Sequence, residues 1–141
     1  MIIFPISRQE FDSILDFEDF LVNVVPSPER NGIYHVRTKL TYLPMGEVPV
    51  GSVAVFRFFG QHLGHAKVRF GLRSQFDAEK IELYPYYITF EPSSVSLFGR
   101  RVSLREFRRL YPHPFCTRSY LDMTVQEYRH LVRLAGSQPL V

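Results

Sequence analysis

Residues 50–72 read VGSVAVFRFFGQHLGHAKVRFGL, and this stretch decides the fold. Apolar and polar side chains alternate on both sides of its central glycines, a pattern that predicts two β-strands joined by a short connection. We expect strands over 53–59 and 65–72, with Gly60 and Gly64 bounding the connection. The inward face of this pair is predicted to carry Ala54, Phe56, Ala66, Val68 and Phe70.

The same two-residue period continues outside this pair. It predicts further strands over 32–37, 86–90 and 94–97. Short strands between early and late helices leave little room for parallel crossovers. The sequence therefore favours a mixed α+β or small-barrel architecture.

Helix starts are indicated by capping boxes, in which Ser or Thr is followed three residues later by Glu. The pairs are Ser7 with Glu10, Ser103 with Glu106, and Thr124 with Glu127. They predict helices over 8–16, 104–111 and 125–135, the last ended by Gly136. Their inward residues are predicted to be Phe11, Ile14, Leu15, Phe107, Leu110, Val125, Tyr128, Leu131, Val132 and Ala135.

Composition bounds the class of protein. The 141 residues suit one domain, 1–141, with a single core, which a longer protein could carry as one module. The one cysteine, Cys116, excludes an internal disulfide and a cysteine-based zinc site. No apolar run approaches the roughly 20 residues of a membrane helix, and no signal peptide is recognised. We therefore expect a cytoplasmic protein that does not bind membranes.

Charge is unevenly distributed along the chain. The net charge is +3, but residues 1–31 carry −4, residues 32–92 carry +2 and residues 93–141 carry +5. All eight bases of the last segment are arginines, whose guanidinium groups can bind phosphate through two parallel hydrogen bonds. The arginine-rich segment favours either a nucleic-acid interface or a solvated face that keeps the protein soluble.

Aromatic residues are numerous, with eight Tyr, thirteen Phe and no Trp. Phe58 and Phe59 place rings on both faces of their strand, so one face needs an explanation besides the core. A base-stacking platform is one explanation, and helices packed over the second face are the other. His62 and His65 are interpreted as polar loop or edge residues. No nucleotide-binding, hydrolase or metal-binding motif is present, so we predict no catalytic residue, cofactor or metal.

Four segments resemble one family. Residues 51–56 (GSVAVF) resemble the glycine-led central strand of the PUA-like superfamily, and residues 63–68 (LGHAKV) resemble its next strand. Residues 83–92 (LYPYYITFEP) resemble a late strand, and residues 117–128 (TRSYLDMTVQEY) an arginine-bearing turn before a Thr-capped helix. Within the superfamily the chain is similar to the EVE and YTH branches. Ser52 stands where the family commonly has an acid, and Tyr34 where YTH readers have Trp.

The resemblance implies a fold and a function. The fold is an α+β, small PUA-like/EVE-type mixed β-barrel with peripheral helices. The function is to bind nucleic acid and recognise a modified base, methylated DNA being favoured over RNA, by flipping the base into an aromatic pocket. The base-binding residues would be Tyr34, Tyr42, Phe58 and Phe59. The nucleic-acid backbone would be held by Arg57, Arg100, Arg101 and Arg118.

Such domains also serve as DNA-specificity modules of McrB-type, modification-dependent restriction systems, which would supply further domains or subunits as partners. Three alternatives remain open. One is an RNA-binding PUA-like module. Another is an ASCH-like hydrolase of modified nucleosides using Lys39, Thr41 and Glu47. The last is a protein-interaction domain whose arginine-rich helix docks an acidic partner.

Overall fold

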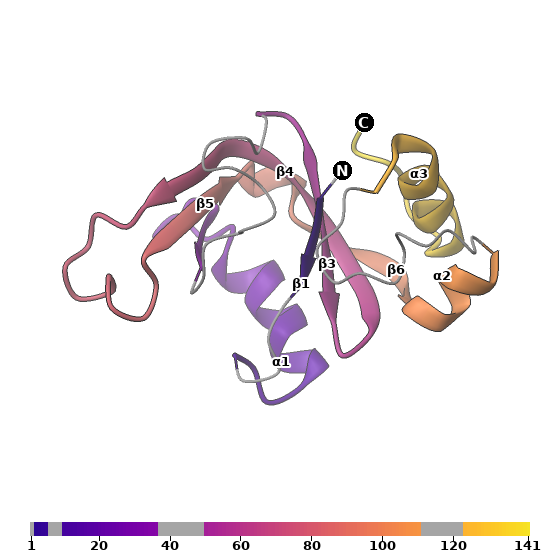
Figure 1. Cartoon of the computed structure of the whole chain (residues 1–141), viewed down its shortest axis with the longest axis horizontal. Helices are drawn as coiled ribbons and strands as arrows, with labels where there is room; N and C mark the ends of the chain where they lie inside the picture. The colour runs from indigo at the N-terminus through magenta and orange to yellow at the C-terminus, as the bar shows by residue number, and fades with distance from the viewer. Residues whose placement is uncertain (1, 6–9, 37–49, 111–122) are drawn as a thin grey trace.

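The computed structural model describes residues 2–5, 10–36, 50–110 and 123–141 and has a mixed α+β fold (Figure 1). The first part of the chain forms β1 (Ile2–Pro5), α1 (Ile14–Asp19), the π-helical turn η1 (Phe20–Val24) and β2 (Ile33–Val36). The second part forms β3 (Val53–Phe58), β4 (Gln61–Ser74), β5 (Tyr86–Phe90), the 3₁₀ turn η2 (Pro92–Ser94), β6 (Ser96–Ser103), α2 (Leu104–Leu110) and α3 (Val125–Leu134).

Strand β4 is the centre of the sheet. Its first half pairs antiparallel with β3 on one edge and with β6 on the other. Its second half pairs antiparallel with β5, which continues through η2 into β6. The outer strands are β1, which runs parallel to β3, and β2, which runs antiparallel to β5. Among the described residues β1 and β2 do not pair with each other, so these pairings do not close a barrel.

Strands β3 and β4 are joined by a tighter turn than the sequence predicts. The turn consists of Phe59 and Gly60, which both have positive φ, +52° and +67°. This is the backbone of a two-residue hairpin turn that matches the twist of its strands. Strand β4 therefore begins at Gln61, and the predicted connection up to Gly64 is already part of the strand.

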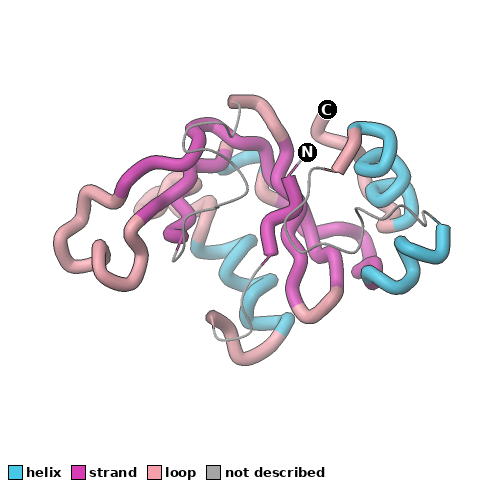
Figure 2. Tube along the Cα trace, in the orientation of Figure 1, coloured by secondary structure: helices cyan, strands magenta, loops and turns pink. Residues whose placement is uncertain are grey.

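Helices cover both faces of the central strands, as Figures 1 and 2 show. One core lies between α1, η1 and the face of the sheet that carries Ala54, Phe56 and Phe58. A second core lies between α2, α3 and the opposite face, which carries Val53 and Val55. Of the two explanations for aromatic residues on both faces of β3, helix packing is the one that the structure supports for this strand.

The predicted inward face is confirmed at four of its five positions. Ala54, Phe56, Ala66 and Val68 are each at most 1% exposed, whereas Phe70 is 39% exposed. The reason is a bulge, because Val68 pairs with Phe90 but Phe70 pairs with the adjacent Thr89. One extra residue in β4 turns Phe70 to the other face of the sheet, and a second register shift before Arg73 returns Leu72, 5% exposed, to the core.

The two C-terminal helices begin where the capping boxes predict. The backbone N–H of Glu106 donates to Ser103 Oγ, and Thr124 and Glu127 form a complete capping box. Helix α3 ends before Gly136, which has a φ of +65°. Leu110, predicted to face inward, is 53% exposed at the last residue of α2.

The predicted start of the N-terminal helix is wrong, and only residues 14–16 of the predicted range are helical among those described. Residues 10–13 are not helical, and α1 begins after Ser13, whose Oγ accepts a hydrogen bond from the backbone N–H of Asp16. Leu15, predicted to face inward, is 70% exposed. The strand predicted over 86–90 is confirmed with its bounds, and those over 32–37, 53–59 and 65–72 are confirmed with shifted ends. Of the strand predicted over 94–97, only Ser96 and Leu97 belong to β6, because Ser94 is the last residue of η2, and β1 was not predicted.

The buried histidines correct a second interpretation. His62 and His65 are 0% and 2% exposed, so they are interior strand residues and not loop or edge residues. His65 contacts the hydroxyl of Tyr128 on α3 through Nδ1 at 2.8 Å, and the same hydroxyl accepts a hydrogen bond from the N–H of Leu140. Within the described ranges, no helix is long and apolar enough to cross a bilayer.

Candidate functional site

A pocket of about 260 Å³ lies where the segment before α1, the start of η1, the η1–β2 connection, strand β2 and the β4–β5 connection meet. Figure 2 shows that connection as a long loop. Sequence separation within the pocket is large, since its walls come from residues 10–35 and 80–84. The lining residues are Glu10, Phe11, Phe20, Arg30, Tyr34, His35, Lys80 and Tyr84.

Half of this lining is aromatic. The Tyr34 ring is 7% exposed, packs edge-on against Phe20 at 5.8 Å between centroids and lies nearly parallel to Phe56 at 6.3 Å. Tyr84 comes from the loop and its ring lies 5.8 Å from that of His35. Because Phe56 and Phe20 belong to the core around α1, Tyr34 is held rigidly at the pocket wall.

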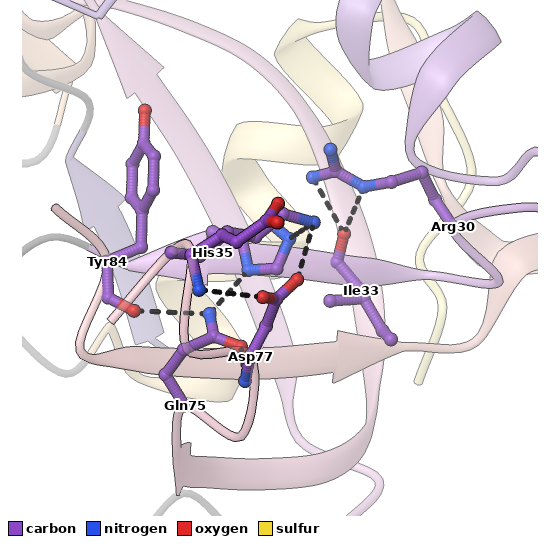
Figure 3. A network of polar contacts seen from close by, with 8 residues as sticks. Arg30, Ile33, His35, Gln75, Asp77 and Tyr84 are labelled. Atoms are coloured by element: carbon purple, nitrogen blue, oxygen red, sulfur yellow. Dashed lines mark hydrogen bonds and ion pairs between the residues drawn. The ribbon is translucent and has the colours of Figure 1, made fainter. Parts of the chain in front are cut away.

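The polar side of the pocket is held by Gln75, which is 5% exposed. Its amide nitrogen donates to the carbonyl of Tyr84 at 3.1 Å and contacts Nδ1 of His35 at 2.9 Å (Figure 3). Its amide oxygen accepts from the N–H of Asp77 at 3.3 Å. This one side chain therefore fixes both the loop and the imidazole ring.

Two cations flank the pocket. The guanidinium of Arg30 donates through two nitrogens to the carbonyl of Ile33, as Figure 3 shows, and lies 5.3 Å from the Phe20 ring centroid. Lys80 Nζ lies 3.5 Å from His35 Nε2 and 3.7 Å from a carboxylate oxygen of Asp77. Both cations are thus fixed near the aromatic wall.

Protonation states follow from burial. Desolvation lowers the pKa of His35 to about 4, with the charges of Arg30 and Lys80 acting in the same direction, so the ring is neutral at neutral pH. Burial raises the pKa of the Tyr34 phenol, which keeps this side chain uncharged. The pocket thus combines neutral rings with two cations and the carboxylate of Glu10 at its side.

A further cation lies in line with the pocket across the sheet. Arg73 on β4 is paired with Tyr87 on β5, and Tyr87 is paired with His35 on β2. Neighbours in a cross-strand row point to the same face, and two strand spacings amount to about 10 Å. The exposed Arg73 also lies 4.8 Å from the ring of Phe70, and Arg69 lies 5.3 Å from the same ring.

The predicted base-binding residues are not brought together. Tyr34 lines the pocket, but Phe58 and Phe59 are not among the residues that line it. Phe58 is 1% exposed and packs against Phe17 and Phe11 in the core, and Phe59 is a turn residue whose ring meets Phe58 edge-on at 4.5 Å. Phe58 is corrected from a pocket residue to a core residue. Tyr42 lies outside the described residues.

The predicted backbone-binding arginines also separate. Arg57 is 7% exposed and donates through Nε and a terminal nitrogen to Nε2 of His62, so it is a buried residue and not a phosphate contact. Arg100 and Arg101 are exposed and form ion pairs with Glu106 and Glu18, at 2.6 and 2.5 Å. They border a different hollow beside Phe98 and Gly99. Outside the described residues lie Arg118, Lys39, Thr41 and Glu47.

Sequence reasoning missed most of the pocket. Phe11 was read as a core residue of a helix, and Phe20, Arg30, Lys80, Tyr84 and Arg73 were not singled out. The available signal was the aromatic and basic composition of residues 67–87. The sequence does not show that this segment packs against residues 10–35, because that contact is tertiary. In the described part of the chain, no group of three or more His, Cys, Asp or Glu side chains could hold a metal ion.

Comparisons with known proteins give a fold and no family. No protein-family model matches the chain, and no curated protein is significantly similar in sequence. Among solved structures, the chain is similar to the crystal structure of Atu2648 from Agrobacterium tumefaciens, with a TM-score of 0.61. The two are 15% identical, and the match covers 96% of this chain and 92% of Atu2648. At this identity the likeness shows the fold alone.

Proposed function

We propose that this chain is a nucleic-acid-binding domain that captures a flipped base, methylated DNA being the favoured ligand, in the pocket between β2, η1 and the β4–β5 loop. The observation that carries the proposal is the combination of four aromatic side chains with two cations around a cavity of about 260 Å³. This volume lies just below the range of about 300–1,000 Å³ typical of drug-sized ligands, so it suits a ligand the size of a base.

Stacking supports this assignment. A flat base inserted beside Tyr84 would exchange stacking in the duplex for stacking on this ring, worth about 1–3 kcal/mol, and Tyr34, 7% exposed, would line the pocket beside the base. Extrusion of a base costs a few kcal/mol, least where pairing is already weak. Stacking on Tyr84 can therefore offset part of the cost of extrusion.

Cations placed outside the pocket support binding of the backbone. Arg73 lies in the same cross-strand row as His35, and Arg69 lies beside it around the Phe70 ring. Phosphates on either side of a flipped nucleotide would meet this edge of the sheet. Arg73 and Arg69 thus take the role that the sequence had assigned to Arg57.

The finer points of the proposal rest on the resemblance of residues 51–56, 63–68, 83–92 and 117–128. The first of these points is that the single domain 1–141 forms a PUA-like/EVE-type barrel. The second is that this domain is the DNA-specificity module of a modification-dependent restriction system. The structural likeness to Atu2648 is compatible with one domain but names no activity.

Binding assays test the proposal. DNA duplexes carrying one 5-methylcytosine or one N6-methyladenine are compared with the unmodified duplex, and a single-stranded RNA is included. We expect at least one modified duplex to bind about tenfold tighter than the unmodified one, and Tyr84→Ala to remove most of this preference because one stacking surface is lost.

A matched control variant distinguishes binding in the pocket from nonspecific binding of DNA. Phe76 is 73% exposed on the same loop but does not line the pocket, so Phe76→Ala should leave the preference unchanged. Equal binding of every DNA duplex, or tighter binding of RNA than of any modified DNA, would contradict the proposal.

A further inference from the structure

The orientation of the Gln75 amide is determined by the backbone. Its nitrogen faces the carbonyl of Tyr84 and its oxygen faces the N–H of Asp77. Turning the amide over would set oxygen against oxygen and nitrogen against nitrogen, at the expense of two hydrogen bonds in a buried place. The second N–H of the same nitrogen is therefore available for His35 Nδ1 at 2.9 Å.

This orientation fixes the tautomer of His35. Because Gln75 donates to Nδ1, that atom must accept, and the proton of the neutral ring lies on Nε2. The low pKa of His35, about 4, keeps the ring neutral at neutral pH. The ring therefore offers an N–H, and not a lone pair, at Nε2.

Two donors then face each other at the pocket wall. His35 Nε2 and Lys80 Nζ are 3.5 Å apart, and neither can accept from the other. Two donors at this separation can share one acceptor placed between them. Asp77 lies 3.7 Å from Lys80, but this contact uses one of the three protons of a solvent-accessible ammonium group.

We propose that this donor pair selects the ligand, so that the pocket takes a base with an exocyclic carbonyl oxygen and rejects adenine-type bases, which carry none. Cytosine, thymine, uracil, guanine and hypoxanthine all present such an oxygen, whereas adenine presents an amino group. An amino group at this place would leave both donors without an acceptor, and each acceptor nitrogen in the adenine ring has a single lone pair, which can satisfy one donor and not both. This inference deepens the proposed function and rests on it.

The tautomer can be tested without any ligand. Long-range ¹H–¹⁵N correlation spectra at pH 7 distinguish protonated from unprotonated ring nitrogens, and a His35→Asn variant assigns the signals. We expect His35 with its proton on Nε2. A proton on Nδ1 would overturn the proposal, because Nε2 would then be an acceptor for Lys80.

Selectivity is tested with a matched pair of bases. Hypoxanthine and adenine differ in the oxygen or amino group at C6 and in the proton at N1, and each is placed opposite an abasic site so that neither is paired. We expect hypoxanthine to bind about tenfold tighter than adenine, and 5-methylcytosine tighter than N6-methyladenine. Equal binding within either pair, or a preference for the adenine-type base, would overturn the inference while leaving base capture intact. Failure of every probe to bind above the unmodified duplex would overturn both.

A variant assigns the preference to this donor pair. Lys80 is exposed, so Lys80→Met should fold, and we expect it to reduce the hypoxanthine-to-adenine ratio severalfold. Arg105→Met on α2 removes the same charge from an exposed site that does not line the pocket and should leave the ratio unchanged. An unchanged ratio in Lys80→Met would overturn the role of the pair.

Discussion

Arg57 and His62 are two polar side chains buried beside each other on β3 and β4. His62 is completely buried, its Nδ1 lies 2.8 Å from the carbonyl of Val102, and its Nε2 receives the guanidinium of Arg57. The carbonyl can only accept, so Nδ1 carries the proton and Nε2 accepts from the arginine. Period-two patterns cannot reveal such a pair, because a histidine between two closely spaced glycines, here Gly60 and Gly64, is typical of a turn.

Acid should destabilise the protein through this histidine. Burial, with the Arg57 charge in addition, lowers the pKa of His62 to about 3, below its ordinary value of 6.5. The unfolded chain therefore binds more protons than the folded one below pH 6.5, and stability falls as the pH falls. Between pH 6.5 and about 4.5 we expect His62 to reduce the free energy of unfolding by about 2–3 kcal/mol.

Urea titrations across this range measure the effect. His62→Gln provides the comparison, because an amide can donate to Val102 and accept from Arg57 without titrating. The variant should lose free energy of unfolding less steeply on acidification than the wild type. Identical slopes would show that His62 is not the group responsible.

At the scale of elements, strands and helix caps were predictable where interactions between residues close in sequence determine them. The Thr124 box places α3 correctly because both of its hydrogen bonds are local. The helix predicted from Ser7 and Glu10 does not include residues 10–13, because Ser13 caps α1 by accepting from the N–H of Asp16; Ser7 lies outside the described residues. Glu10 instead lies near Tyr84, with its carboxylate 3.5 Å from that hydroxyl. The spacing of Ser and Glu does not show which of two possible N-caps is used when the Glu of one box contacts a distant loop instead.

The β3–β4 turn yields a prediction of its own. Phe59 adopts a left-handed conformation, with φ of +52°, which a bulky residue tolerates poorly and asparagine tolerates well. We expect Phe59→Asn to be more stable than Phe59→Ala by about 0.5–1 kcal/mol, since both remove the ring and only Asn suits the turn. Thermal unfolding of the two variants measures the difference. Alanine as the more stable residue would contradict it.

At the scale of the whole molecule, two cores share one sheet. Side chains of β3 alternate between the core under α1 and the core under α2 and α3, with Phe56 in one and Val55 in the other. Because both cores pack on the same strands, unfolding of these strands would expose the apolar side chains of both cores to solvent. The two cores should therefore unfold together.

Paired core truncations test this coupling. Leu21 in the first core and Leu131 in the second are each at most 1% exposed. Leu21→Ala and Leu131→Ala should each lower the free energy of unfolding by about 2–5 kcal/mol. Both should keep one transition, seen at the same urea concentration by near- and far-ultraviolet circular dichroism. A variant with two separated transitions would show that the cores are independent.

The candidate pocket is formed by elements that are distant in sequence. This explains why Tyr34 is the one predicted base-binding residue that lines it. Its walls join Arg30 and His35 to Lys80 and Tyr84 across the sheet, and Gln75 holds the junction. Such contacts depend on register and on bulges in β4, neither of which a single sequence specifies. The aromatic composition predicted an aromatic pocket, but the topology of the sheet determines which rings line it.

The buried Arg57–His62 contact has a consequence for how this sequence can change over time. Removing the histidine alone leaves a desolvated guanidinium without this acceptor, and removing the arginine alone leaves Nε2 without its donor. A replacement of His62 that cannot accept from Arg57 is therefore destabilising on its own, whereas a joint replacement by two apolar residues of similar volume is not. Among descendants of this chain, such a change at position 62 should occur together with a change at position 57.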